Sequence, residues 1–152
     1  MEDLNNIKKE GLDVTGCDPS KGAEIGKKFG LNIIKQFFKP NYFTNKKLFF
    51  DIVISRHFIE HVFDPIQLIQ SFEKVLNKNG ILVLETPNVS HYIAKGFLEV
   101  FSLQHISLFT IDSITYLLNR CGFEIIISIE SPDNLIIVAN KNEHLNAREK
   151  IN

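Results

Sequence analysis

The residues best equipped for chemistry in this sequence are His57, Glu60 and His61, which directly follow an apolar run at 48–55. Their spacing reads H-x-x-E-H, the pattern of inverted zinc proteases, in which two histidines bind the metal and the glutamate acts as a base. That chemistry requires both histidines on one long helix, whereas these residues stand at the mouth of a turn after a buried strand. We therefore expect a different kind of ligand site here, and no metal.

The same loop begins with Ser55 and Arg56, so Ser55, Arg56 and His57 leave the strand as three consecutive polar residues. In open α/β sheets, ligands bind outside the carboxyl ends of the strands, which favours a binding role for these three. The other two residues allow simpler interpretations. His61 is equally well explained as a packed side chain whose ring bonds to a local carbonyl. Glu60 is explained as an acid that complements a helix start, without a catalytic role.

Helices and strands alternate along the sequence and must position this loop. The run at 48–55 is nearly all apolar, which favours burial on both faces. Alternation favours a parallel α/β sheet with right-handed crossovers, ending in an antiparallel hairpin around the turn residues 131–134. The expected strands are 12–17, 31–38, 48–55, 81–85, 123–128 and 135–140. The expected helices are 1–10, 21–29, one from Pro65 closed by Asn79 and Gly80, and one capped by Thr110 and closed by Gly122. Residues 39–47 are expected to form a polar loop, and residues 91–109 show no clear hydrophobic periodicity.

Length and composition fit one ordinary globular domain, which we expect over 1–140 with a polar tail over 141–152. A chain of 152 residues with 44% hydrophobic content can bury roughly 70% of its unfolded surface. The net charge of −1 gives no reason to expect nucleic acid or an anionic membrane as a partner. Cys17 and Cys121 are far apart and lack C-x-x-C spacing, which favours a reducing compartment. No apolar run approaches the ~20 residues of a membrane span, so we expect a cytoplasmic protein.

Three blocks of sequence together match the pattern of one protein family. They are VTGCDPS at 14–20, DIVISRHFIEHVFDP at 51–65, and ILVLETPN at 81–88 followed by QHISLFT at 104–110. Together they resemble class I S-adenosylmethionine-dependent methyltransferases of the small-molecule type. The resemblance implies a Rossmann-like sheet, mostly parallel, with a C-terminal antiparallel hairpin. It also implies S-adenosylmethionine (SAM) as the cofactor and methyl transfer to a small-molecule acceptor.

The resemblance assigns cofactor-binding roles to five residues. Asp18 stands where the family's second strand ends in an acidic residue, whose carboxylate accepts hydrogen bonds from both ribose hydroxyls. Phe37 or Phe38, at the next strand end, would border the adenine. Ser55 and Arg56 would frame the cleft in which the methyl group is transferred. A simpler interpretation of Asp18 is an Asx turn.

Two histidines are the catalytic candidates. His57 would face the methyl-transfer cleft, and His105 matches a histidine that is the general base in some relatives that alkylate sugars at carbon. Gln104 stands where that subgroup commonly has an acidic residue, and His105 is also explained as an anchor for the helix begun at Thr110. A base is needed only when the acceptor arrives protonated, and histidine is suited to that task near neutral pH.

The glycine-rich turn with which such domains open is not found in this sequence. Gly22, Gly26 and Gly30 fall four apart along one helix face, where they permit close packing rather than form a loop. We therefore expect a truncated methyltransferase domain that lacks the first strand and exposes the edges beside it. Such edges invite pairing, so a homodimer or a complementing chain would supply the strand. The alternative is a non-catalytic remnant or a domain retained for binding a partner.

Overall fold

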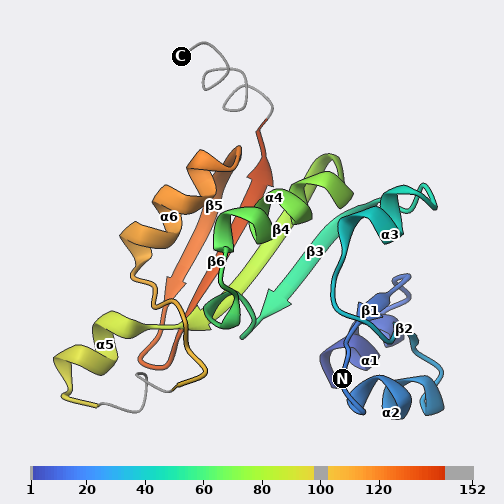
Figure 1. The fold of residues 1–152 in the computed structure, drawn as a ribbon, viewed down its shortest axis with the longest axis horizontal. Helices are drawn as coiled ribbons and strands as arrows, with labels where there is room; N and C mark the ends of the chain where they lie inside the picture. The colour runs from blue at the N-terminus through green and yellow to red at the C-terminus, as the bar shows by residue number, and fades with distance from the viewer. Residues whose placement is uncertain (1, 98–102, 143–152) are drawn as a thin grey trace. The chain divides into compact units, whose positions relative to one another are not determined.

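The chain forms two compact units, Met1–Lys39 and Pro40–Asn152, each with its own β-sheet (Figure 1). The structure, a computed structural model, describes residues 2–97 and 103–142. The single domain expected over 1–140 stays a prediction. Lys141, the first residue of the expected tail, ends the last strand, and 143–152 lie outside the described residues.

The first unit is a small α/β layer. It contains helices α1 (Glu2–Lys9) and α2 (Gly22–Lys28) and strands β1 (Thr15–Cys17) and β2 (Asn32–Ile34). The two strands pair in parallel, and the buried side chains between the layers are Ala23, Leu31 and Ile33. All four expected elements are present, but both strands are shorter than expected. The second ends early because the backbone N–H of Gln36 turns back to donate to the Ile34 carbonyl at 3.0 Å.

The second unit is built on a four-stranded sheet in the order β3-β4-β6-β5. Its strands are β3 (Phe50–Arg56), β4 (Leu76–Pro87), β5 (Phe123–Glu130) and β6 (Asn134–Lys141). β3 and β4 are parallel, while β6 pairs antiparallel with both β4 and β5. The predicted α/β class and the C-terminal antiparallel hairpin are therefore confirmed.

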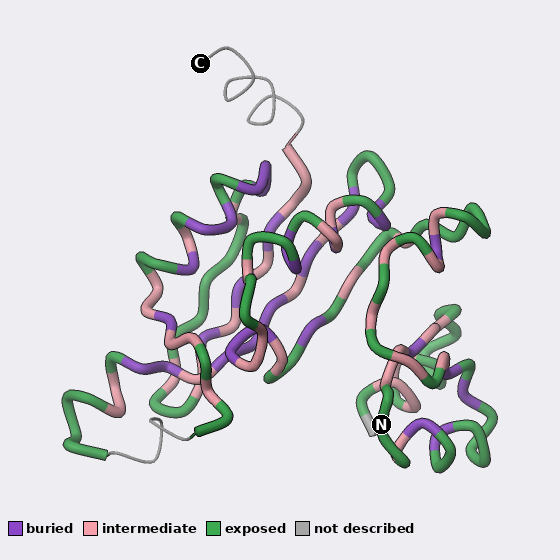
Figure 2. Tube along the Cα trace, in the orientation of Figure 1, coloured by how far each residue is buried: buried purple, intermediate pink, exposed green. Residues whose placement is uncertain are grey.

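Helices pack against the sheet and complete the buried core of the second unit (Figure 2). Helix α6 lies against β5, and α4 lies against β4. The large apolar side chains with no exposed surface come from both layers: Ile69, Leu82, Leu84, Ile114, Leu118, Phe123, Leu135 and Ile137. The helical elements are α3 (Pro40–Thr44), the 3-10 turn η1 (Ile59–His61), α4 (Pro65–Val75), α5 (Val89–Ala94) and α6 (Ile111–Arg120).

Both long helices of this unit begin where the sequence predicts. The Asp64 carboxylate accepts a hydrogen bond from the Gln67 backbone N–H at 2.8 Å, and Pro65 takes the first helical position. Thr110 and Ser113 bond to each other's backbone N–H groups in a capping box at the start of α6. Such caps satisfy backbone donors that the helix itself leaves unpaired.

Three local predictions were wrong. Helix α4 ends at Val75 rather than at Asn79 and Gly80, because the chain from Leu76 enters β4 with a register shift. Gly80 is instead required by space, since an added Cβ would lie 2.8 Å from the Leu76 side chain. Residues 39–47 include helix α3, whose Phe43 ring packs edge-on against Phe50 and supplies the apolar anchor that a polar loop would lack.

The third wrong prediction is the burial of β3 on both faces. Ile52 and Ile54 are 50% and 48% exposed. Within the described residues β3 is an edge strand and pairs with β4 alone, so fewer neighbouring side chains cover it. Among the described residues, no helix combines the length and the apolar character that crossing a membrane requires.

Candidate functional site

The second unit gathers polar side chains where β3 and β4 end. The two strands are parallel, and Arg56 is paired in register with Glu85, so both carboxyl ends meet at one edge of the sheet. The Arg56 guanidinium forms an ion pair with the Glu85 carboxylate. Asn134 of β6 donates to the same carboxylate at 3.1 Å. The expected residues Ser55 and Arg56 therefore lie at a polar strand edge, with Ser55 buried.

His57 lies between two carboxylates. Its Nδ1 is 3.4 Å from Glu60 Oε1, and its Nε2 is 3.4 Å from Glu85 Oε1. Its backbone N–H donates to the Glu85 carbonyl at 2.9 Å. The backbone of His57 has φ +46°, a left-handed conformation that non-glycine residues adopt only when their surroundings hold them there. The sharp turn at the end of β3 is thus tied to β4.

Glu60 is the most deeply buried acid in the described residues, with 1% of its surface exposed. The Thr86 hydroxyl donates to its Oε2 at 3.2 Å. Its Oε1 is buried and accepts no hydrogen bond within the described part of the chain. The interpretation of Glu60 as an acid beside a helix start does not account for this burial, because such an acid would remain in solvent.

The segment before α6 is fastened to η1 by backbone hydrogen bonds. The Glu60 carbonyl accepts from the N–H groups of Ile106 at 2.8 Å and Ser107 at 3.1 Å. His61 Nδ1 lies 2.8 Å from the Gln104 carbonyl oxygen. The expected bond from the His61 ring to a carbonyl is thus present, although its partner lies 43 residues away.

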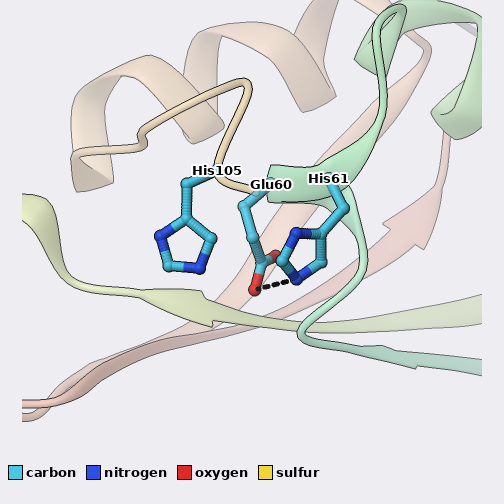
Figure 3. Close-up of side chains that lie close together, drawn as sticks. All are labelled: Glu60, His61 and His105. Atoms are coloured by element: carbon cyan, nitrogen blue, oxygen red, sulfur yellow. Dashed lines mark ion pairs between the residues drawn. The ribbon is translucent and has the colours of Figure 1, made fainter. Parts of the chain in front are cut away.

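These bonds bring His105 beside η1. The His61 and His105 ring centroids are 5.1 Å apart, and Figure 3 shows the Glu60 carboxylate between the two rings. The structure therefore groups His57, Glu60, His61 and His105 in one unit. His105 belongs to the segment before α6, at 103–110, and not to the helix itself.

In the first unit, Asp18 follows β1 and is half-buried. Its Oδ1 accepts a hydrogen bond from the Ser20 backbone N–H at 2.7 Å, so the Asx turn is formed. Burial and, to a smaller extent, the charge of Asp18 raise the pKa of the Cys17 thiol. Phe37, beyond the parallel neighbour β2, is 67% exposed, whereas Phe38 is half-buried. Since β1 and β2 are parallel, the carboxylate and the aromatic pair follow the same edge of this sheet.

Glu60 and Glu85 were not among the predicted site residues. Glu85 ends an apolar strand in ILVLE, and an acid in that position was the available signal. The position of Glu60 depends on its backbone hydrogen bonds with Ile106 and Ser107, and pairing between such distant segments leaves no local sequence pattern.

The comparisons with known proteins agree with this architecture. The family model for a methyltransferase domain matches residues 2–128. The chain therefore belongs to the methyltransferase domain family, as its three sequence blocks predict. No curated protein matches the sequence.

Several solved structures share the fold. A SAM-dependent methyltransferase from Archaeoglobus fulgidus is similar with a TM-score of 0.70 and 20% identity, over 92% of this chain and 81% of that one. A possible histamine N-methyltransferase from Thermotoga maritima gives a TM-score of 0.64 and 19% identity, over 87% and 74% of the two chains. The Burkholderia thailandensis 1,6-didemethyltoxoflavin-N1-methyltransferase was solved with bound 1,6-didemethyltoxoflavin and S-adenosylhomocysteine. It gives a TM-score of 0.66 and 14% identity, over 93% of this chain and 66% of that one. At these identities the likeness establishes the fold.

Proposed function

We propose that this chain binds SAM and transfers its methyl group to a small-molecule acceptor. The observation that carries the proposal is the methyltransferase family match over residues 2–128. The small-molecule acceptor is supported by the resemblance of the sequence blocks to that branch and by the 1,6-didemethyltoxoflavin bound to the Burkholderia relative.

The residues present fit the proposed cofactor in their chemistry. Asp18 offers a carboxylate directly after β1, and two carboxylate oxygens suit two vicinal hydroxyls as donors. Phe37 and Phe38 offer aromatic surface after β2, and the exposed Phe37 ring is suited to stack on a purine. In the second unit, Ser55 and Arg56 end β3, where ion pairing with Glu85 fixes the Arg56 guanidinium. We assign cofactor contacts to these five residues.

When bound, SAM supplies an electrophilic methyl group on a sulfonium sulfur. The protein's task is mainly to hold the acceptor in line with that group, because positioning supplies most of the rate in such a displacement. His57 and His105 are the proposed bases. Either imidazole would take the proton that a hydroxyl, amine or acidic carbon loses as it becomes methylated.

Calorimetric titration with S-adenosylhomocysteine tests the cofactor proposal. We expect saturable binding by the wild-type chain, and a loss of about tenfold or more in affinity for Asp18→Ala, since two hydrogen bonds to a charged group are removed. Asp13→Ala is the matched control, because Asp13 is an exposed acid of the same unit. Absence of binding by a folded wild-type chain would contradict the proposal and favour a non-catalytic, partner-binding domain.

We further propose that the edge of β3 left unpaired by the described residues pairs with β3 of a second copy. Antiparallel self-pairing centred on Val53 places Ile52 opposite Ile54, and both are half-exposed in the single chain. Such a contact is symmetric and joins β-branched pairs across the strands. Light scattering should show a dimer that Ile54→Lys disrupts, while Ile126→Lys on the exposed face of β5 leaves it intact. A monodisperse wild-type monomer that unfolds cooperatively would contradict this pairing.

A further inference from the structure

We propose that Glu60, His61 and His105 bind a divalent metal ion of borderline character, such as Zn²⁺. One ligand atom from each residue lies within 4.8 Å of the other two, and all three residues belong to the second unit. Figure 3 shows the side chains converging from η1 and from the segment before α6. The family match assigns no metal, and the sequence led us to expect none.

The carboxylate of Glu60 is the first reason. Its Oε1 is buried and accepts no hydrogen bond in the described part of the chain, while Oε2 is held by the Thr86 hydroxyl. A buried carboxylate oxygen without a partner is costly, and a cation satisfies it. The hydroxyl bond orients the carboxylate in the way that outer partners commonly orient metal ligands.

The tautomer of His61 is the second reason. A carbonyl oxygen can only accept, so the ring nitrogen of His61 that faces the Gln104 carbonyl, Nδ1 at 2.8 Å, must carry the hydrogen. In the neutral ring this leaves the lone pair on Nε2. That atom lies 3.8 Å from Glu60 Oε1. Metal-binding histidines typically donate their other ring N–H to a carbonyl or carboxylate in this way.

His105 is delivered by backbone bonds that do not depend on a metal. The Glu60 carbonyl holds the N–H groups of Ile106 and Ser107, the two residues after His105. The His105 ring is thereby kept beside the His61 ring. A preformed arrangement of this kind lowers the ordering cost of binding an ion.

The ligand set indicates which class of ion would bind. Two imidazoles and one carboxylate suit Zn²⁺ and neighbouring transition metals better than Mg²⁺ or Ca²⁺, which prefer oxygen. Ligand atoms on a tetrahedral ion with bonds near 2.1 Å lie roughly 3.4 Å apart, so side-chain shifts of about 1 Å close the site. Three protein ligands leave a coordination position open, as in catalytic rather than structural zinc sites. With the ion bound, His105 is a ligand, and His57 remains as the proposed base.

This set differs from the H-x-x-E-H reading of the sequence, which would use His57 and His61 as ligands. In the structure, His57 Nε2 turns to Glu85. The rival explanation for the buried carboxylate is an ion pair with a protonated His57, whose Nδ1 is 3.4 Å from Glu60 Oε1. The two explanations make opposite predictions for substitutions of His57 and His105.

Equilibrium dialysis of the tag-free, full chain against Zn²⁺, with bound metal measured by mass spectrometry, tests the proposal. The measurement requires neither SAM nor an acceptor, so it succeeds or fails independently of the methyltransferase proposal. We expect one zinc per chain in the wild type, in His57→Ala, and in the control His91→Ala, which removes a histidine of α5 outside the cluster. Glu60→Gln and His105→Ala should each weaken binding by at least ~100-fold, since loss of an outer partner alone costs 10–100-fold.

Co²⁺ absorption adds a readout of the ligands, because d–d bands report coordination by nitrogen and oxygen. Circular dichroism confirms that each variant is folded, and half-buried His105 is the substitution best tolerated if Glu60→Gln does not fold. Zinc retained by His105→Ala, zinc lost in His57→Ala, or no stoichiometric zinc in the wild type would each overturn the proposal.

Discussion

The hydrogen bond between Thr86 and Glu60 offers a sharp test of how the buried carboxylate is held. Thr86 is fully buried, and its hydroxyl donates to Glu60 Oε2 at 3.2 Å. Thr86→Val keeps the shape of the side chain and removes only the donor. The other carboxylate oxygen, Oε1, accepts no hydrogen bond in the described residues. The substitution therefore removes the one hydrogen bond that the Glu60 carboxylate accepts within the described part of the chain.

The expected loss of stability follows from the type of bond. A hydrogen bond to a charged group contributes about 1.5–3 kcal/mol, so we expect Thr86→Val to lower the free energy of unfolding by about 2 kcal/mol. For a chain of this size that corresponds to a fall of roughly 4–8 °C in Tm. In a Glu60→Gln background the bond is neutral, and the same substitution should cost only about 1 kcal/mol.

Urea denaturation of the four chains of this double-mutant cycle measures both quantities, and an unchanged m-value would show that the denatured state is unaffected. Thr115→Val, at a half-buried position of α6, is the matched control and should change stability by less than about 0.5 kcal/mol. The reasoning is refuted if Thr86→Val costs no more than this control, or if its cost is the same with glutamine at position 60.

Three further predictions follow from the fold. Asp64→Ala removes the cap that accepts from Gln67 and should cost about 1 kcal/mol in urea denaturation; no loss would mean that α4 does not depend on this cap. Leu84→Ala, at a fully buried position of the central strand β4, should cost about 2–5 kcal/mol, and a loss below 1 kcal/mol would contradict its burial. Burial and the nearby Asp18 raise the pKa of Cys17. Alkylation of Cys17 by iodoacetamide at pH 8.5 should therefore be slower than alkylation of a free cysteine. Its rate should keep rising at higher pH, where the rate of the free cysteine levels off. Equal rates for the two thiols at every pH would contradict the raised pKa.

The parts of the fold that were predictable are those encoded by neighbouring residues. Asp64 and Pro65 indicate the start of α4, and Thr110 and Gly122 mark the two ends of α6. These positions can be predicted because helix caps and left-handed turns favour particular residue types. The family, the α/β class and the terminal hairpin were also predictable, since each depends on the order and period of short segments.

What could not be predicted depends on which strands find partners. An apolar strand such as β3 has the same sequence whether both faces are covered or not, so its exposure at Ile52 and Ile54 was missed. Asn79 and Gly80 resemble a helix stop, yet pairing of Leu76 with Phe50 draws the chain into β4 earlier. The role of Glu60 likewise arises from bonds to a segment more than 40 residues away.

The measurement that tests the central claim most directly is a titration of the isotope-labelled chain with S-adenosylhomocysteine, followed by amide NMR. We predict that the amide signals of Asp18 and Arg56 both shift and saturate during the titration, because a cofactor contact is assigned to each of these residues. Signals of exposed positions on α6, such as Asn119, should not move. A spectrum unchanged at saturating ligand, or shifts at only one of the two positions, would contradict the claim that this chain binds the cofactor with the residues assigned to it.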